Sequence, residues 1–278
     1  MKKIIWTASY PKSGNTWLRA IISSMLYTSK GSFNFNLLKL IPQFDKNERY
    51  QYLKELNIKD FKEININIQN ISKHWEVSQE KIVLNNKINP TYNIFKTHSA
   101  NLNVNTNKFT NINLSAGCIY IVRDPREVAI SFSKHFNKSY DETIDFMTNK
   151  YSCLSPLDKK SLVLVSSWDV NYQSWKISDI PSLFIKYENI LEDTEKEILK
   201  IYNFLNTLLE LNKENVGQLV KNIAKNTKIE ILRKHEKKFG FGEKSKFNKN
   251  FFDKAKVNSW KEKLSKFHIS KIEKRFEK

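Results

Sequence analysis

One stretch near the start of the chain restricts its fold more than any other. Residues 3–8 are a short, mostly apolar run that predicts a strand, and residues 18–26 carry apolar side chains at helical spacing. Between them stands Tyr-Pro-Lys-Ser-Gly-Asn-Thr-Trp, residues 10–17. A strand, a turn that contains glycine and a helix together form the layout of an anion-binding loop, because backbone N–H groups and the positive end of the helix face the turn.

The side chains of this loop suit an anion as well. Gly14 lets the backbone approach a ligand closely, Lys12 adds a mobile positive charge, and Ser13 and Thr16 add hydroxyl donors. The loop is not a Walker A motif, because its lysine precedes the glycine and no glycine lies upstream. The segment Pro-Lys-Ser-Gly alone is equally compatible with an ordinary turn that begins a helix. The full string of residues 10–17 is more specific and resembles the loop that binds the 5′-phosphosulfate in sulfotransferases that use 3′-phosphoadenosine-5′-phosphosulfate (PAPS).

Length and composition indicate a folded, globular protein. Its 278 residues are 40% hydrophobic and 13% aromatic, which is typical of a globular protein with a sizeable core. Only two cysteines occur, Cys118 and Cys153, so a disulfide framework is not expected and a reducing compartment suits the chain. No stretch approaches 18 consecutive apolar residues. We therefore expect a cytoplasmic protein, and the sequence does not predict its oligomeric state.

The chain is strongly basic, with a formal net charge of +18. Residues 221–278 hold 19 Lys and Arg against 7 Asp and Glu. This charge is compatible with affinity for nucleic acids or membranes, with a funnel for a polyanionic cofactor, or with solvated lysine-rich helix faces. We favour solvated faces for most of these lysines, because no zinc spacing, helix-turn-helix pattern or RNA-binding aromatic motif accompanies them. No specific nucleic-acid partner is expected.

The order of predicted elements indicates an α/β fold with a central parallel sheet covered on both faces. Further strands are predicted at residues 92–97, 118–122 and 183–187, and helices at 77–84 (capped by Ser78 or a nearby polar residue), 125–135, 144–150, 160–177, 190–209 and 262–276. We expect a single domain over residues 1–278, in which residues 31–92 and 139–160 are insertions that shape an acceptor pocket.

Two more polar clusters follow predicted strands. Lys96-Thr97-His98 ends one strand, and the segment from Arg123 to Ser131 follows another. Ligands of open parallel sheets bind at the carboxyl ends of the strands, so the three clusters are expected to share one site. Each has a simpler explanation in isolation: a structural histidine, a strand-end lysine that reaches solvent, or an arginine paired with Asp124 or Glu127. Their common location favours a functional site.

All three clusters resemble segments of PAPS-dependent sulfotransferases, which implies a three-layer, P-loop-kinase-like fold. The resemblance implies that His98 removes the acceptor proton and that Lys12 and Lys96 stabilise charge near the transferred sulfuryl group. It also implies a set of cofactor-binding residues around the 5′-phosphate, the 3′-phosphate and the adenine: Lys12, Ser13, Gly14, Asn15, Thr16, Trp17, Arg123, Ser131, Tyr187, Thr227 and Lys254. For Trp17 and Tyr187, simple core packing is an alternative.

The resemblance is weakest near the C-terminus. Residues 251–260 are similar to a family segment written Arg-Lys-Gly with a tryptophan a few residues on, but Asp253 stands at the arginine position and Ala255 at the glycine position. An acid beside a phosphate would repel it, unless Lys254 or Lys256 compensates. Cofactor affinity is therefore the property that this departure puts in question.

The sequence thus predicts transfer of a sulfuryl group from PAPS to a hydroxyl or amine of a small-molecule acceptor, without a metal. Two alternatives stay open. One is a nucleotide-dependent kinase, which would need a Walker-type lysine and a magnesium-binding acid. The other is a basic protein that binds nucleic acid or anionic glycans and keeps a degenerate nucleotide site. The identity of the acceptor is not predicted.

Overall fold

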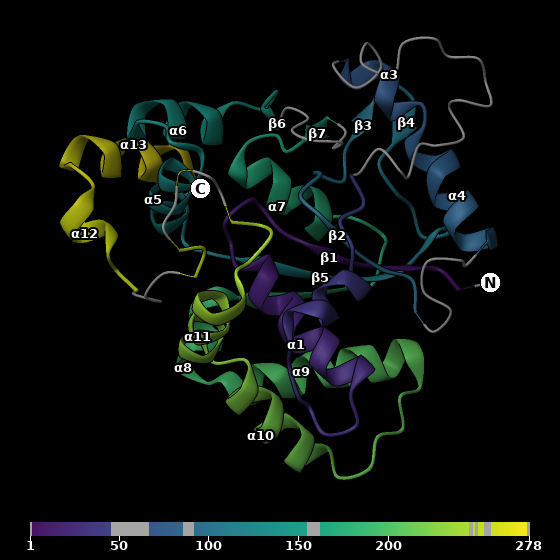
Figure 1. Ribbon diagram of the computed structural model, residues 1–278. Coiled ribbons are helices and arrows are strands. Elements are labelled where there is room, and N and C mark those ends of the chain that lie inside the picture. Colours follow the sequence, from purple (N-terminus) through teal and green to yellow (C-terminus); the bar gives the residue numbers. More distant parts are fainter. Residues whose placement is uncertain are drawn as a thin grey trace. The chain divides into compact units, whose positions relative to one another are not determined.

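A computed structural model of the chain describes residues 2–45, 67–85, 92–154, 162–244, 247, 250–252 and 257–276. Its central sheet has the strand order β2-β1-β5-β8, formed by Ile94–Thr97, Ile4–Ala8, Ser115–Val122 and Ser182–Lys186. Strand β1 pairs in parallel with both β2 and β5, and helices flank the sheet (Figure 1). The expected α/β class with a central parallel sheet is confirmed.

The register of the strands explains why the segments with the predicted polar clusters begin at the same edge of the sheet. Ala8 at the end of β1 is paired with Thr97 at the end of β2 and with Tyr120 near the end of β5. The chain leaves these ends into residues 9–14, into His98 and into Arg123. The carboxyl ends of these parallel strands therefore lie at the same edge of the sheet, and that is the edge at which open parallel sheets bind ligands.

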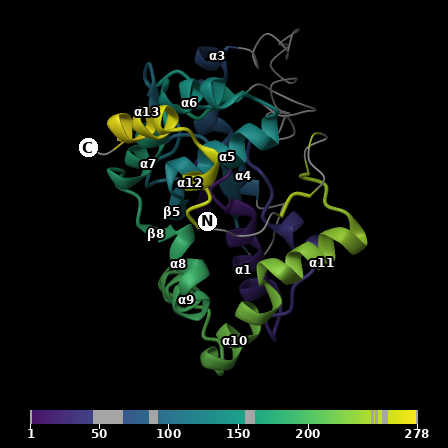
Figure 2. The same ribbon diagram turned by 90° about the vertical axis from the view of Figure 1, so that its left-hand side faces the viewer.

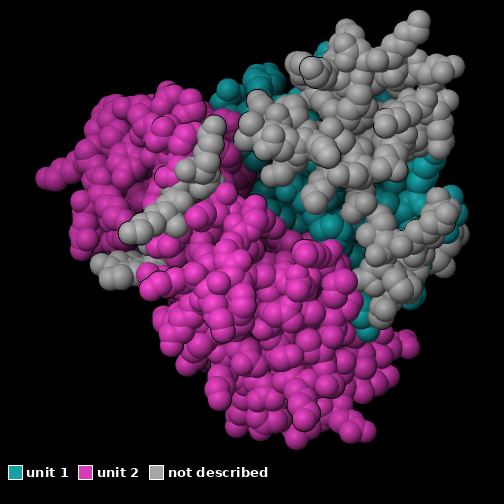
Figure 3. Space-filling view, in the orientation of Figure 1, with its two compact units in different colours: residues 1–10, 42–120, 149–182 teal, residues 11–41, 121–148, 183–278 magenta. Residues whose placement is uncertain are grey.

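The chain forms two compact units (Figure 3), and we describe each by itself. The first unit comprises residues 1–10, 42–120 and 149–182. Its elements besides β1 and β2 and most of β5 are α3 (Ile68–Ser72), α4 (Trp75–Asn85), β3 (Asn103–Val104), β4 (Asn107–Lys108), β6 (Cys153–Leu154), β7 (Val163–Leu164) and α7 (Trp168–Lys176). The β3–β4 and β6–β7 pairs are antiparallel.

Aromatic residues fill the core of this first unit. Trp6 of β1 is fully buried, and its ring lies 5.1 Å from that of Phe44 and 5.4 Å from that of Phe109, centre to centre. Trp75 and Trp175 complete the cluster, and each is at most 1% exposed. Such rings contribute large buried apolar areas, so the ends of β1 and β2 rest on a rigid base.

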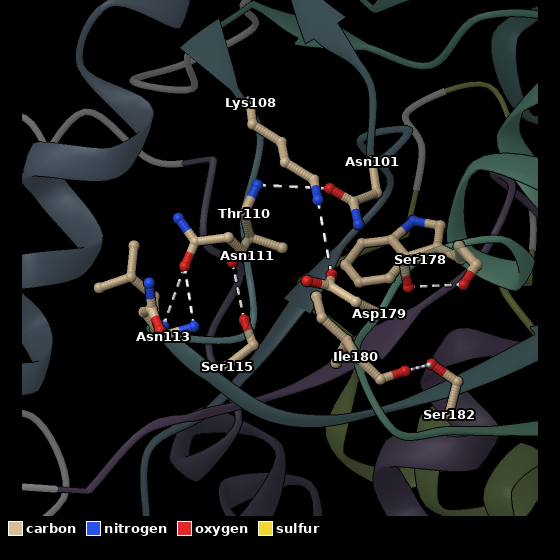
Figure 4. Close-up of polar contacts among 12 residues, drawn as sticks. Asn101, Lys108, Thr110, Asn111, Asn113, Ser115, Ser178, Asp179, Ile180 and Ser182 are labelled. Carbon is tan, nitrogen blue, oxygen red and sulfur yellow. Dashed lines mark hydrogen bonds and ion pairs between the residues drawn. The ribbon is translucent and has the colours of Figure 1, made fainter.

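Polar side chains close the turn before β5 (Figure 4). The Asn111 side chain accepts from the backbone N–H groups of Asn113 and Leu114, at 2.9 and 3.2 Å. The Thr110 and Ser115 hydroxyls lie 2.7 Å apart, and Ser115 also accepts from the Trp6 indole at 2.8 Å. This network ties the start of β5 to β1 and so helps to set the register of the sheet.

The second unit comprises residues 11–41, 121–148 and 183–278. It contains α1 (Asn15–Tyr27), the 3-10 helix η1 (Phe35–Leu40), α5 (Pro125–Phe136), α6 (Tyr140–Thr148), α8 (Tyr187–Glu192), α9 (Thr194–Leu209), α10 (Val216–Asn226), α11 (Ile229–Phe239), α12 (Trp260–Lys263) and α13 (Lys266–Phe276). Helix α10 packs on α1 and α9, and α13 lies against α5 and α6 (Figures 1 and 2). None of the helices within the described ranges is long and apolar enough to cross a membrane.

Several predicted boundaries were wrong for local reasons. The helix predicted at 77–84 begins at Trp75, so Ser78 lies inside it and donates to the Trp75 carbonyl rather than capping the helix. The helix predicted at 160–177 covers only Trp168–Lys176, and β7 precedes it. The helix predicted at 190–209 is divided at Asp193, whose carboxylate accepts from the Lys196 N–H and caps α9. The helix predicted at 262–276 is likewise divided, into α12 and α13.

Candidate active site

The loop before α1 has the backbone shape that its sequence predicts. Gly14 has φ 101° and Lys12 has φ 68°, so two positions of the turn are left-handed. A Cβ atom on Gly14 would lie 2.6 Å from Cδ2 of Tyr187, which no side chain tolerates without movement. The glycine is therefore required both by its dihedral angle and by the aromatic ring against it. The turn leads directly into the N-terminus of α1, the end of a helix at which backbone N–H groups point outward and can bind an anion.

Polar atoms in and beside this loop are buried but not satisfied. Ser13 Oγ, Trp17 Nε1 and Arg123 Nε are each buried and have no hydrogen-bond partner in the part of the chain that the structure describes. Buried donors without partners are costly and uncommon in native proteins. Their grouping around a left-handed glycine turn is what a site for a polar, anionic ligand requires.

Arg123 lies across the loop from Gly14. Its guanidinium carbon is 4.4 Å from the centre of the Tyr187 ring, and one Nη donates to the Lys12 carbonyl at 3.4 Å. The ion pair with Glu127 that the sequence left as an alternative also occurs, at 3.4 Å. The Glu127 carboxylate is shared, because it also accepts from the Ser259 hydroxyl at 2.9 Å and the Trp260 N–H at 3.1 Å. Arg123 is thus held in place while Nε stays available.

The other predicted cofactor residues differ in what they contact. Trp17 and Tyr187 pack edge to face at 5.5 Å, so core packing is part of their role. The Thr16 hydroxyl donates to Glu243 at 3.2 Å, and the fully buried Thr227 donates to the Ile223 carbonyl of its own helix at 2.8 Å. Asn15 begins α1, and Ser131 is half-buried on α5. Lys254, Asp253 and Ala255 lie outside the described residues.

His98 is oriented by β1 within the first unit. Its Nδ1 lies 2.8 Å from the Ser9 carbonyl oxygen and 3.2 Å from the Ser9 hydroxyl. A carbonyl oxygen only accepts, so Nδ1 carries a hydrogen, and in the neutral ring Nε2 then holds the lone pair. The backbone of His98 is fixed in turn by Asn171, whose amide donates to the His98 carbonyl at 3.0 Å. This is the arrangement of a ring that presents Nε2 as a base.

Lys96 occupies a buried position beside an acid that sequence reasoning missed. Lys96 is 8% exposed, and Asp45 is 1% exposed. The Asp45 carboxylate accepts from the Thr97 and Ser99 hydroxyls, each at 3.2 Å. Burial raises the pKa of Asp45 to about 6, although both hydroxyls and the Lys96 charge act to lower it. No local sequence pattern marks Asp45, because only the tertiary fold brings it to Lys96 and Thr97.

This pKa makes the stability of the protein depend on pH. At pH values well below 4 the Asp45 carboxyl is neutral in both the folded and unfolded states. Because the folded pKa is the higher one, ionisation opposes folding as pH rises from 4 to 6, by up to about 3 kcal/mol. Denaturant unfolding should therefore show Asp45→Asn gaining on wild type between pH 4 and 7. A constant difference across this range would contradict the assignment; Asp179→Asn, at an exposed ion pair, is the control.

Two further residues could not be predicted because the residues that they contact are distant in the sequence. Asn171 bridges the His98 carbonyl and the Tyr120 hydroxyl, and its sequence context is an unremarkable helix. His135 lies at the last turn of α5, with Nδ1 3.2 Å from Nζ of Lys12. No group of three or more metal-ligating side chains with metal-site geometry occurs among the described residues.

Comparison with known proteins identifies the family. The model of the sulfotransferase domain matches residues 2–278, so the chain belongs to the sulfotransferase family. Flavonol 4′-sulfotransferase of Flaveria chlorifolia is 24% identical over 97% of this chain and 77% of its own length. Amine sulfotransferase of Oryctolagus cuniculus is 26% identical over 78% of this chain and 60% of its own length.

Solved structures agree on the fold. A retinol dehydratase crystallised with retinol and PAP superposes with a TM-score of 0.62, at 18% identity, over the whole of this chain and 81% of its own. A mouse sulfotransferase crystallised with PAP gives a TM-score of 0.58, at 17% identity, over 99% of this chain and 84% of its own. The expectation of a sulfotransferase fold, drawn from residues 10–17, 96–98 and 123–131, is confirmed.

Proposed function

We propose that this protein transfers a sulfuryl group from PAPS to a hydroxyl or amine of a small-molecule acceptor, and that His98 is the general base. The observation that carries the proposal is the group of buried donors without partners around Gly14, namely Ser13 Oγ, Trp17 Nε1 and Arg123 Nε. They fit a nucleotide with phosphate groups and an aromatic base. That relatives of this chain are crystallised with PAP supports the choice of nucleotide.

The residues of the second unit would hold this cofactor. The loop from Lys12 to Thr16 would bind the 5′-phosphate end with backbone N–H groups, the lysine charge and the Ser13 hydroxyl. Arg123 would grip the 3′-phosphate, because guanidinium and phosphate form two parallel hydrogen bonds, and Ser131 would add a hydroxyl. Trp17 and Tyr187 would contact the adenine. PAPS supplies an activated sulfuryl group and leaves as 3′-phosphoadenosine-5′-phosphate (PAP).

The residues of the first unit would serve the acceptor. Nε2 of His98 takes the proton of the acceptor hydroxyl or amine as the new bond to sulfur forms. The Ser9 carbonyl holds the ring in the required tautomer, and Asn171 fixes the backbone of His98. Lys96, buried beside Asp45, would stabilise negative charge that develops on sulfuryl oxygens, since charge–charge interactions are stronger where water is excluded. Each of these groups acts without a metal ion.

Ligand-induced thermal stabilisation separates this proposal from its alternatives. Binding to the native state raises the melting temperature, and at equal concentration a tighter ligand raises it more. We expect PAP to stabilise the protein more than ATP with magnesium does, and more than a mixed-sequence oligonucleotide does. A larger shift with ATP and magnesium would favour a kinase, and one with the oligonucleotide alone would favour a basic binding protein. The cytoplasmic location and the single-domain organisation stay predictions.

Removing Arg123 should penalise the 3′-phosphate specifically. A hydrogen bond to a charged group contributes roughly 1.5–3 kcal/mol. Arg123→Ala should therefore reduce the preference for PAP over adenosine 5′-monophosphate by on the order of 10- to 100-fold. Calorimetric titration at fixed salt measures both affinities. Lys138→Ala, which removes an exposed cation paired with Glu142, should leave the ratio unchanged. An unaltered ratio in Arg123→Ala would exclude this role.

A further inference from the structure

A histidine contacts the lysine of the anion-binding loop within the second unit. Nδ1 of His135 lies 3.2 Å from Nζ of Lys12. His135 is half-buried in the last turn of α5, four residues beyond Ser131 and therefore on the same face of that helix. The helix that carries the predicted 3′-phosphate serine thus also reaches the lysine of the 5′-phosphate loop.

An aromatic wall completes the surroundings of this lysine. Nζ of Lys12 lies 4.4 Å from the centre of the Phe251 ring, and the His135 ring meets Phe251 edge to face at 6.2 Å. Phe251 is fixed by its backbone N–H, which donates to the Glu236 carboxylate. A ring face attracts an ammonium group without neutralising it. The Lys12 ammonium therefore lies beside both a ring nitrogen of His135 and the face of an aromatic ring.

The charge states of this pair follow from hydrogen-bond chemistry. An ammonium group donates and does not accept, so Nδ1 of His135 must carry a lone pair. The ring is then neutral, with its hydrogen on Nε2, and Lys12 keeps its full positive charge. An aspartate or glutamate at this place would also hold the lysine, but it would add a negative charge beside the ligand phosphate. A neutral acceptor orients the cation and leaves the site attractive to anions.

We propose that His135 is a positioning residue that orders the Lys12 ammonium before the cofactor arrives. A free lysine side chain loses much rotamer freedom when it binds, and an ordered one has lost that freedom already. The inference rests on the proposed function, because it takes the phosphate end of PAPS as the anion that Lys12 meets. It extends the proposed function, because it assigns part of the affinity of the loop for the cofactor to His135, which lies outside the loop.

Three substitutions of His135 separate the contributions of shape, acceptor and charge. His135→Phe keeps a ring against Phe251 but has no acceptor. His135→Asn places a neutral amide oxygen near the position of Nδ1, and His135→Asp is its isostere with a negative charge. Calorimetric titration should give a PAP affinity within about threefold of wild type for His135→Asn and about tenfold weaker than wild type for His135→Phe. His135→Asp should bind PAP more weakly than His135→Asn does. Melting curves without ligand verify that each variant is folded.

The same substitutions on a Lys12→Ala background show whether His135 acts through the lysine. In a double-mutant cycle, the difference in PAP affinity between His135→Phe and His135→Asn should disappear on the Lys12→Ala background. Wild-type affinity in His135→Phe would overturn the inference. The inference would also be overturned if a folded His135→Asn bound PAP as weakly as His135→Phe does, or if the loss of PAP affinity in His135→Phe persisted on the Lys12→Ala background. Failure of the wild type itself to bind PAP would instead overturn the proposed function, and the inference with it.

Discussion

His98→Ala should lower kcat by ~10²–10⁴-fold while PAP affinity changes less than twofold. The expected split follows from the tautomer of His98, whose Nδ1 donates a hydrogen bond to the Ser9 carbonyl, so that Nε2 carries the lone pair. In the proposed mechanism the imidazole removes a proton in the transition state, so its loss should affect turnover and not the binding of the nucleotide. Steady-state kinetics with a competent acceptor and calorimetry with PAP measure the two quantities separately.

Ser9→Ala is the matched control for this prediction. It removes the hydroxyl that lies 3.2 Å from Nδ1, but the backbone carbonyl of residue 9 still accepts from the ring. We expect its kcat to stay within a few-fold of wild type, because the tautomer is set by the carbonyl. Full turnover in His98→Ala would show that another group is the base. A large loss of PAP affinity would show that His98 serves the nucleotide instead.

Gly14→Ala should disrupt the anion-binding loop. Its φ of 101° costs an L-residue ~1–2 kcal/mol, and the new Cβ would lie 2.6 Å from Cδ2 of Tyr187 and 3.2 Å from Cδ1 of Ile121. Displacing packed side chains typically costs a further ~1–3 kcal/mol. We expect the free energy of unfolding to fall by about 2–5 kcal/mol and PAP affinity to fall at least tenfold, because Tyr187 also packs under Arg123.

Gly217→Ala tests whether this effect belongs to the site. Gly217 lies in α10 of the same unit, and a Cβ there meets no atom within 4 Å. Alanine also favours a helix more than glycine does, so this variant should be as stable as wild type or slightly more so. Denaturant unfolding of both variants gives the comparison. Equal stability of Gly14→Ala and wild type would contradict the packing described for the loop.

Local sequence was sufficient for the parts of the fold whose signals are contiguous. The run from strand to glycine turn to helix at residues 3–28 and the apolar strand before Arg123 were each predicted and are present. The loop at residues 10–14 was predicted for the same reason: an apolar strand, a glycine and a periodic helix leave few other backbone paths. The resemblance of three short motifs then indicated the family, which the match over residues 2–278 confirms.

Contacts between distant segments could not be predicted. Asp45 meets Thr97 and Ser99 across more than fifty positions, and His135 meets Lys12 across 123. Neither hydrophobic periodicity nor motif spacing in the sequence predicts such pairs. The predicted helix ends were wrong where a capping side chain starts a new helix within a continuous apolar pattern, as Asp193 does before α9. The role of Asp253 stays open, since it lies outside the described residues.

The central claim is sulfuryl transfer from PAPS to a small acceptor, and one assay tests it directly. The purified protein is incubated with radiosulfur-labelled PAPS and a panel of phenols, alcohols and amines. We predict that at least one acceptor causes PAP and labelled product to form in equal amounts, and that His98→Ala abolishes this stimulation while still binding PAP. A parallel reaction replaces PAPS with labelled ATP and magnesium. No acceptor-dependent release of PAP with PAPS, together with phosphoryl transfer from ATP to an acceptor, would contradict the account.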